Sequence, residues 1–198
     1  MAKKKWMTRV INTAMCYPRS PRGMRNNNPL NIRFSEVNEW QGIIGRDKEK
    51  GGMCVFATMY QGIRAAMLLI STYQRKYNKR TIRDIISRWA PPQDKNHTEM
   101  YIKIVCDNMK VEPEFIPHFG VQREMYDCFR LIYAMALVEN GVNPHLYISE
   151  TDMTRAYQEA FPRECATFSR EPEVTRCFNK DEKDGSNNSS VITFNYKV

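Results

Sequence analysis

Four asparagines within six positions are the least ordinary chemistry in this 198-residue sequence. They lie in the segment Arg25-Asn-Asn-Asn-Pro-Leu-Asn-Ile-Arg33. Side-chain amides both donate and accept hydrogen bonds, so such a segment could form a rigid polar loop or one wall of a sugar-binding groove. An ordinary asparagine-rich turn explains the same composition. The segment by itself leaves both interpretations open.

Carboxyl groups are the second set of residues that could do chemistry. Glycoside cleavage needs a protonated carboxylic acid beside the leaving oxygen and usually a second carboxylate, whereas a lytic transglycosylase can use one acid because the substrate's own hydroxyl attacks. The first 35 residues contain no Asp or Glu. We therefore predict Asp47, Glu49 and Asp94 as catalytic candidates. The residues Glu36, Glu39 and Glu99 stay open as further candidates.

Each of the three leading candidates has a structural alternative. Asp47 and Glu49 fall in a predicted hairpin loop among arginines and lysines. Neighbouring cations lower the pKa of a carboxyl group, which suits a base or a charge stabiliser better than a general acid. An exposed charged turn explains both residues equally, and a turn or cap explains Asp94.

Metal and cofactor chemistry has little support in the sequence. The three histidines are scattered singly, and the six cysteines lack Cys-x-x-Cys or Cys/His ligand spacing. There is no Gly-rich phosphate loop. We predict no metal site and no cofactor, and we expect Cys106 and Cys128 to be free, buried thiols in helices.

Charge is distributed unevenly along the chain. The first 110 residues carry +13, and the remaining 88 carry −5. A basic module of this kind suits a polyanion, either nucleic acid or the acidic groups of a bacterial cell wall. A solvated basic surface is the alternative. The sequence contains no run of about 18 apolar residues and no signal-peptide core, so we predict neither a membrane span nor secretion.

Periodicity and capping signals predict the elements that position these residues. Five helices are expected, over 60–77, 81–89, 99–109, 120–139 and 149–161. Their expected boundaries include capping boxes at Thr81 and Ser149, an N-cap at Thr98, and a C-terminus at Asn140-Gly141. A hairpin is expected from strands at 39–45 and 53–57. The predicted fold class is α+β, mainly α.

Several motifs in fixed order carry a family resemblance over roughly residues 22–112. After the asparagine segment come Glu39-Trp-Gln-Gly42, Tyr60-Gln-Gly-Ile-Arg-Ala-Ala66, and Trp89-Ala-Pro-Pro followed by Asn96-His-Thr-Glu-Met-Tyr101. This series resembles a lysozyme-like family of phage virion proteins and, more distantly, flagellar-type β-N-acetylglucosaminidases. The resemblance implies a lysozyme-like helical domain with a small β-hairpin lobe and a cell-wall glycan as substrate.

The resemblance also implies a set of substrate-binding residues. These are Asn26, Asn27, Asn28, Asn31, Trp40, Asn96 and Tyr101. Two departures from the family pattern stand out. The glucosaminidases carry a helical catalytic Glu upstream of the asparagine loop, which is missing here, and Leu30 replaces the usual glycine.

These observations predict four regions: a basic arm at 1–22, a lysozyme-like module at 23–112, a helical extension at 113–162, and a tail at 163–198 with a possible edge strand. The extension and tail could bind other virion or assembly proteins. The predicted function is a peptidoglycan-active glycosidase or lytic transglycosylase, located in the phage virion or in the bacterial cytoplasm before delivery. Two alternatives stay open: a non-catalytic virion structural or cargo protein, and a nucleic-acid-binding module.

Overall fold

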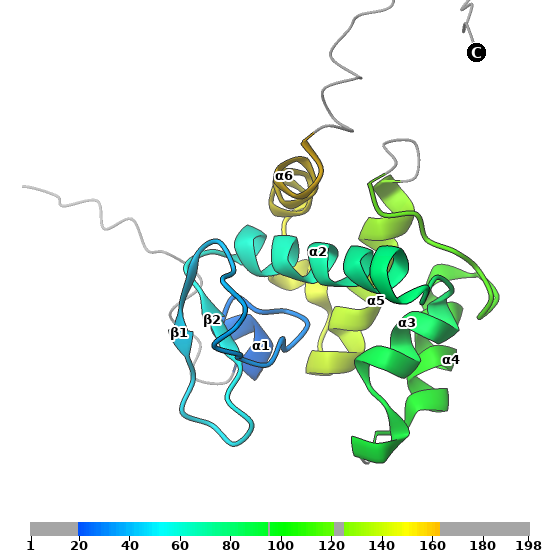
Figure 1. Ribbon diagram of the computed structural model, residues 1–198, viewed down its shortest axis with the longest axis horizontal. Helices are drawn as coiled ribbons and strands as arrows, with labels where there is room; N and C mark the ends of the chain where they lie inside the picture. The colour runs from blue at the N-terminus through cyan, green and yellow to red at the C-terminus, as the bar shows by residue number, and fades with distance from the viewer. Residues whose placement is uncertain (1–19, 95, 121–124, 163–198) are drawn as a thin grey trace, which may run out of the picture.

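The computed structural model describes residues 20–94, 96–120 and 125–162, in which helices accompany one small antiparallel sheet (Figure 1). The elements are α1 (Arg22–Arg25), β1 (Ile43–Arg46), β2 (Cys54–Phe56), α2 (Met59–Tyr77), α3 (Ile82–Trp89), η2 (Pro92–Asp94), α4 (Thr98–Met109), α5 (Met125–Asn140), η4 (Pro144–Leu146) and α6 (Glu150–Ala160). The predicted α+β, mainly α class is confirmed. In these ranges no helix is long and apolar enough to cross a membrane.

The predicted hairpin forms, but its first strand begins later than expected. Residues 39–42 lie outside β1, which starts at Ile43 and pairs with β2 in antiparallel register. The Ile43 amide donates to the Trp40 carbonyl at 3.2 Å, closing a turn, and Gly42 has a φ of +78°. A φ of +78° lies outside the extended region, so the strand starts only after this turn ends.

Capping chemistry sets the ends of three helices as predicted. Thr81 and Asp84 form a reciprocal capping box that starts α3, and the Ser149 hydroxyl accepts the Asp152 amide at the start of α6. Helix α5 ends at Asn140, and Gly141 follows with a φ of +64°. These signals act locally, which is why the sequence alone locates them.

The N-cap expected at Thr98 is wrong. Thr98 is the first residue of α4, and His97 occupies the cap position. The Thr98 hydroxyl instead donates to the Ala90 carbonyl at 2.6 Å. A buried threonine satisfies its hydroxyl where an acceptor is available, and here the end of α3 supplies one.

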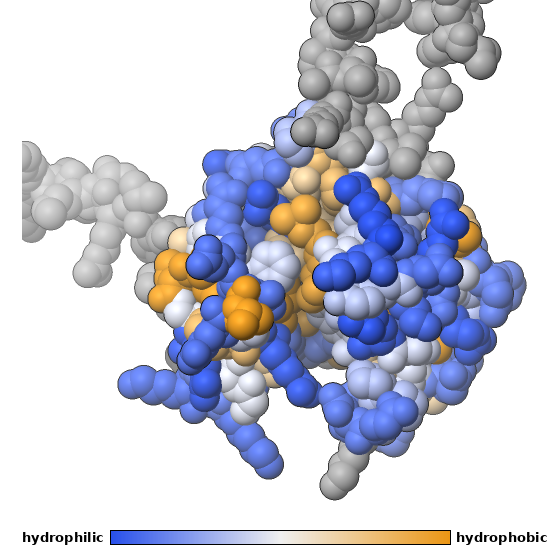
Figure 2. All heavy atoms as spheres, viewed as in Figure 1, coloured by the Kyte–Doolittle hydropathy of each residue, from blue (hydrophilic) through white to orange (hydrophobic). Residues whose placement is uncertain are grey.

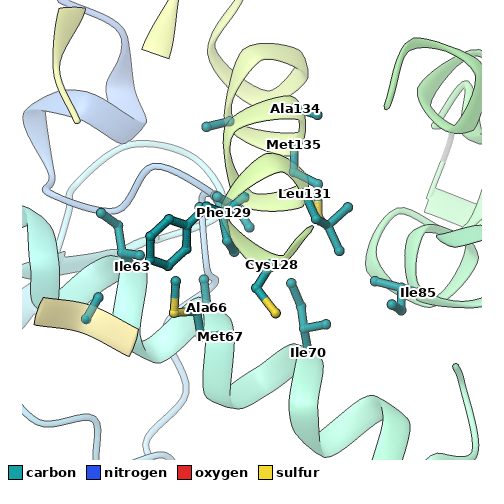
Figure 3. Packing of buried hydrophobic residues seen from close by; sticks show 14 of the residues in the cluster. Ile63, Ala66, Met67, Ile70, Ile85, Cys128, Phe129, Leu131, Ala134 and Met135 are labelled. Atoms are coloured by element: carbon teal, nitrogen blue, oxygen red, sulfur yellow. The ribbon is translucent and has the colours of Figure 1, made fainter. Parts of the chain in front are cut away.

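One hydrophobic core joins the helices on either side of residue 112. Figure 3 shows Ile63, Met67 and Ile70 of α2 facing Cys128 and Leu131 of α5. The same cluster includes Tyr157 and Phe161, at the end of the described chain. Each fully buried large apolar side chain contributes about 1.5–3 kcal/mol, so this shared core couples the two segments in folding. The boundary at 112 stays a prediction.

The burial predicted for Cys106 and Cys128 in helices is confirmed, since they lie buried in α4 and α5, and Cys54 of β2 is buried as well. The expected extended arm falls mostly outside the described residues, although Arg22 at its end belongs to α1. The tail at 163–198, with its possible edge strand, lies outside the described residues altogether.

The small lobe, made of α1, β1 and β2 with their loops, lies near the N-terminal end of α2, and α3 and α4 lie near its C-terminal end (Figure 1). Figure 2 shows hydrophilic residues over most of the α3 and α4 side of this view. The loop at residues 26–31 connects the small lobe to the helices, because the Asn140 side chain at the end of α5 donates to the Pro29 carbonyl in this loop.

Candidate functional site

A partly exposed carboxyl group at the end of α5 collects three hydrogen-bond donors from distant parts of the chain. Glu139 Oε1 accepts the Trp89 indole N–H and the Tyr101 hydroxyl, each at 3.0 Å. Its Oε2 accepts the Asn31 side-chain amide at 3.2 Å. Glu139 itself is neither fully buried nor fully exposed. We call these four residues the Glu139 site.

Each donor is held by the element that carries it. Tyr101 lies in the first turn of α4 and is 7% exposed, while Trp89 ends α3 with its ring edge-on to Tyr73, 6.3 Å between centroids. Asn31 follows buried Leu30 and has a φ of +51°, a left-handed conformation that asparagine tolerates. Leu30, which replaces the glycine of the family pattern, does not itself have a positive φ.

The end of α5 is also tied directly to the asparagine loop. The Asn140 side-chain amide donates to the Pro29 carbonyl at 2.7 Å, next to the contact between Asn31 and Glu139. A Cβ at Gly23 would lie 2.5 Å from Asn140 Oδ1 and 3.0 Å from Asn31 Oδ1. The absence of a side chain on Gly23 thus lets α1 lie against this junction.

Burial controls the protonation of the Glu139 site. Desolvation raises the pKa of Glu139, and the hydrogen bonds from Asn31, Trp89 and Tyr101, which lower it, do not outweigh the burial. Burial also raises the pKa of Tyr101 well above its ordinary value, with the nearby Glu139 adding to the effect. Tyr101 therefore stays a neutral donor. Since Oε1 already accepts two hydrogen bonds, the proton of the acid belongs on Oε2.

A general acid needs a carboxyl group that stays protonated at a higher pH than an ordinary carboxyl group does. The three donors stabilise the ionised carboxylate of Glu139 more than the neutral acid, because hydrogen bonds to an ionised carboxylate are stronger. The site can therefore release a proton and then stabilise the anion that is left.

The pKa of Asp47, one of the predicted catalytic residues, is shifted in the opposite direction from that of Glu139. Arg22 holds both of its oxygens at 2.6 Å, and the Asn26 amide and the Met53 backbone N–H add hydrogen bonds of 2.7 and 3.0 Å. Chiefly because of Arg22, the pKa of Asp47 is well below its ordinary value. Asp47 is thus an ionised anchor that binds α1 to the hairpin loop. The cation responsible, Arg22, is distant in sequence.

The other two predicted catalytic carboxylates also face arginines of the small lobe. Glu49 pairs with Arg25 at 2.5 Å and is 53% exposed. Asp94 approaches Arg33 at 3.5 Å and is 46% exposed. A catalytic role for Asp47, Glu49 or Asp94 stays a prediction, and Glu139 fits the acid better because burial raises the pKa of its carboxyl group.

The first three asparagines use their amides within the lobe. The buried Asn28 side chain donates to the carbonyls of Ile32 and Cys54, both at 3.0 Å, and accepts the Ile32 amide. Asn27 donates to the Phe56 carbonyl at 3.0 Å, and Asn26 to Asp47. These bonds fasten the loop to β2 and the hairpin. Substrate binding by these asparagines stays a prediction.

The remaining predicted binding residues lie in different surroundings. Asn31 and Tyr101 are brought together on Glu139. Trp40 is partly buried in the small lobe, and in the described residues its buried indole nitrogen has no hydrogen-bond acceptor. Asn96 is exposed and donates to the Pro91 carbonyl at 3.0 Å. A glycan contact by Trp40 or Asn96 also stays a prediction.

Sequence reasoning missed Glu139 because its motifs ended near residue 112. A local signal was present. The negative end of the helix dipole disfavours an acid in the last turn, where Lys, Arg or His are the stabilising choices. A glutamate at the end of an apolar helix, directly before Asn140-Gly141, breaks that rule. Such local violations are expected at functional sites.

No family model matches this sequence. The chain is similar to Protein P5 of Pseudoalteromonas phage PM2, with 37% identity over 134 residues, which cover 64% of this chain and 75% of that protein. Identity at this level across most of the relative's length reflects a common fold and origin. The chain therefore belongs to the same protein family as Protein P5 of this bacteriophage.

Proposed function

We propose that this protein is a phage virion protein that cleaves peptidoglycan glycan strands, as a glycosidase or lytic transglycosylase, with Glu139 as the general acid. The observation that carries the proposal is the partly buried carboxyl of Glu139, which accepts three hydrogen bonds and has a raised pKa. All three of its partners, Asn31, Trp89 and Tyr101, come from the motifs that resemble lysozyme-like virion proteins. Membership in a phage protein family supports the phage setting.

The reaction begins with proton transfer from Glu139. Its Oε2–H donates to the glycosidic oxygen, the C1–O bond breaks, and the sugar left behind gains oxocarbenium character. Trp89 and Tyr101 stabilise the carboxylate that forms, since both donate to Oε1. The carboxylate then takes a proton from a water or from the substrate's own hydroxyl, which attacks C1. The first route is hydrolysis and the second is lytic transglycosylation.

In this proposal Asp47 keeps the small lobe in place rather than donating a proton. Its lowered pKa and its bonds to Arg22 and Asn26 suit a permanent anion. The attached asparagine loop carries Asn31 to Glu139. Asp47 is thus a positioning residue, and its replacement is expected to act through stability.

The test is clearing of purified peptidoglycan by the full chain at pH values from acid to neutral. Glu139→Gln keeps the shape of the side chain but cannot supply the proton, so we expect a loss of about 10²–10⁴-fold in the release of soluble fragments. Glu114→Gln, at a position 70% exposed, is the matched control and should keep activity. Glu49→Gln and Asp94→Asn should also remain active.

Analysis of the fragment ends separates the two reactions, because hydrolysis leaves reducing ends and transglycosylation leaves anhydro ends. Equal clearing by the wild type and Glu139→Gln would refute the assignment of the acid. No clearing by the wild type at any pH would refute enzymatic function itself.

A second candidate function is a non-catalytic virion structural or cargo protein that keeps this fold. The observation that favours it is the relationship to a phage protein. Binding to peptidoglycan or to other virion proteins without clearing would support this alternative. In that case Glu139→Gln should change stability and leave binding unchanged.

A further inference from the structure

The two chain segments that hold Glu139 also carry an exposed ion pair. Asn31 donates to Glu139 from the small lobe, and Arg33 is two residues further along that segment. Trp89 donates from the end of α3, and Asp94 ends the short helix η2 that follows. Arg33 Nη2 and Asp94 Oδ2 lie 3.5 Å apart. The pair therefore connects the two segments that flank the carboxyl group.

This ion pair is weak compared with the others in the lobe. Arg22 and Arg25 hold their carboxylates at 2.6 and 2.5 Å. Arg33 is 70% exposed, and its separation from Asp94 is at the limit of hydrogen bonding. An exposed pair of this kind contributes little to stability, because both ions stay hydrated and their side chains lose freedom on pairing. The guanidinium group of Arg33 is thus free to exchange Asp94 for another anion.

The backbone of Arg33 is fixed even though its side chain is exposed. Arg33 forms a β-bridge with Met53, and its carbonyl accepts the Cys54 thiol at 3.5 Å. Its neighbour Ile32 is buried and 5% exposed. Arg33 therefore has a rigid attachment point two residues along the chain from Asn31, which donates to Glu139. The Cα atoms of Asn31 and Arg33 are at most about 7 Å apart, because two residues of extended chain span no more than that.

We propose that Arg33 selects glycan strands that carry carboxylate groups, by binding a substrate carboxylate in place of Asp94 beside the Glu139 site. This inference rests on the proposed function. A planar guanidinium matches a carboxylate in shape and charge and can bind it through two parallel hydrogen bonds. The peptide side chains of peptidoglycan supply such carboxylates, whereas a neutral glycan does not. The positive charge of the first 110 residues favours approach of the same polymer.

The experiment measures binding, so that it does not depend on cleavage. Insoluble peptidoglycan, stripped of attached polymers by acid, is used as prepared or with its carboxylates converted to primary amides. The parent protein is the full chain with Glu139→Gln, which prevents turnover during cosedimentation. Added to this parent are Arg33→Gln, Asp94→Asn, and Arg46→Gln as the matched control. Arg46 is an exposed arginine on β1 of the same lobe.

We expect the parent to bind the native polymer about tenfold more tightly than the amidated one, which is the effect expected of one solvent-exposed guanidinium–carboxylate contact. Arg33→Gln should remove this preference and leave binding to the amidated polymer unchanged. Arg46→Gln should keep the preference. Asp94→Asn should increase it, since the substrate then has no competitor for Arg33.

Three results would overturn the proposal: a parent without preference, an Arg33→Gln variant that keeps the preference, or an Arg46→Gln variant that loses it equally. The last result would mean that overall charge, rather than Arg33, decides binding. Clearing by the wild-type chain is scored separately. A protein that prefers the native polymer through Arg33 but never clears it would refute the proposed catalysis and support the assignment of Arg33.

Discussion

Replacing Gly62 by alanine tests how α2 packs against the asparagine loop. Gly62 is a buried residue in the first turn of α2 (Met59–Tyr77). A Cβ at this position would overlap the Asn27 carbonyl oxygen and would lie 2.9 Å from the Asn27 carbonyl carbon and 3.2 Å from Asn28 Cα. All three neighbours are backbone atoms. They cannot move aside by changing a rotamer, so the helix or the loop has to shift.

The size of the effect follows from two opposing contributions. Overpacking costs about 1–3 kcal/mol, and moving the loop instead would break the two hydrogen bonds of the Asn27 amide to Phe56 and Ala57, at about 1 kcal/mol each. Alanine has a better helix propensity than glycine by about 1 kcal/mol, which offsets part of this cost. Because the overlap is with backbone atoms, the cost lies at the upper end, at about 2–3 kcal/mol, and the net loss in the free energy of unfolding is about 1–2 kcal/mol.

Urea denaturation followed by circular dichroism measures this loss. In thermal unfolding of a chain of this size, Tm should fall by about 2–8 °C. Thr72→Ala, at an exposed position of the same helix, gains propensity without a clash and is the matched control. It should stay within about 0.5 kcal/mol of the wild type. A Gly62→Ala variant that is as stable as the wild type would show that α2 does not pack closely against the backbone of Asn27 and Asn28.

Two further predictions concern pH. Because the pKa of Glu139 is raised by folding, the folded chain binds more protons than the unfolded chain at pH values above the ordinary carboxyl pKa. The wild type therefore loses stability as pH rises through this range, whereas Glu139→Gln does not. In urea titrations between about pH 4 and 8, the free energy of unfolding of the wild type should decrease relative to that of Glu139→Gln as pH rises. A difference between the two proteins that does not change with pH would contradict the burial of this carboxyl. Asp47 has a lowered pKa, so its stabilisation is present above about pH 4 and is lost as pH falls through the folded pKa. Asp47→Asn should therefore cost about 2 kcal/mol at neutral pH, below the ~3–5 kcal/mol of a fully buried pair, and almost nothing in strong acid; an equal cost at both pH values would rule out this linkage.

Prediction from the sequence succeeds where the interactions are local. The capping box of Thr81 and Asp84 forms between residues three apart, and the helix end at Asn140-Gly141 depends on a left-handed glycine. The apolar side chains of α2 recur at the helical period and face one core. Such features need no knowledge of the rest of the chain, so helix positions and the fold class follow from the sequence.

Prediction fails where the partner is far along the chain. The Thr98 hydroxyl donates to the Ala90 carbonyl, eight positions earlier, instead of capping α4. The late start of β1 is a local exception, because the turn that Trp40 and Ile43 close occupies residues expected in the strand. The ion pair of Asp47 with Arg22 spans 25 positions. The sequence indicates that a carboxylate lies among cations, but the particular cation depends on how α1 meets the hairpin.

The sequence by itself determined the helices, the hairpin, the buried thiols and the family motifs that include Asn31 and Tyr101. Only the tertiary structure decided that these motifs meet at Glu139, which lies 108 positions from Asn31. The physical reason is that a raised pKa depends on removal of water, and burial is a property of the packed core rather than of neighbouring residues. The chain carries Glu139 at the end of one helix and the three hydrogen-bond donors on other segments, and the fold brings them together.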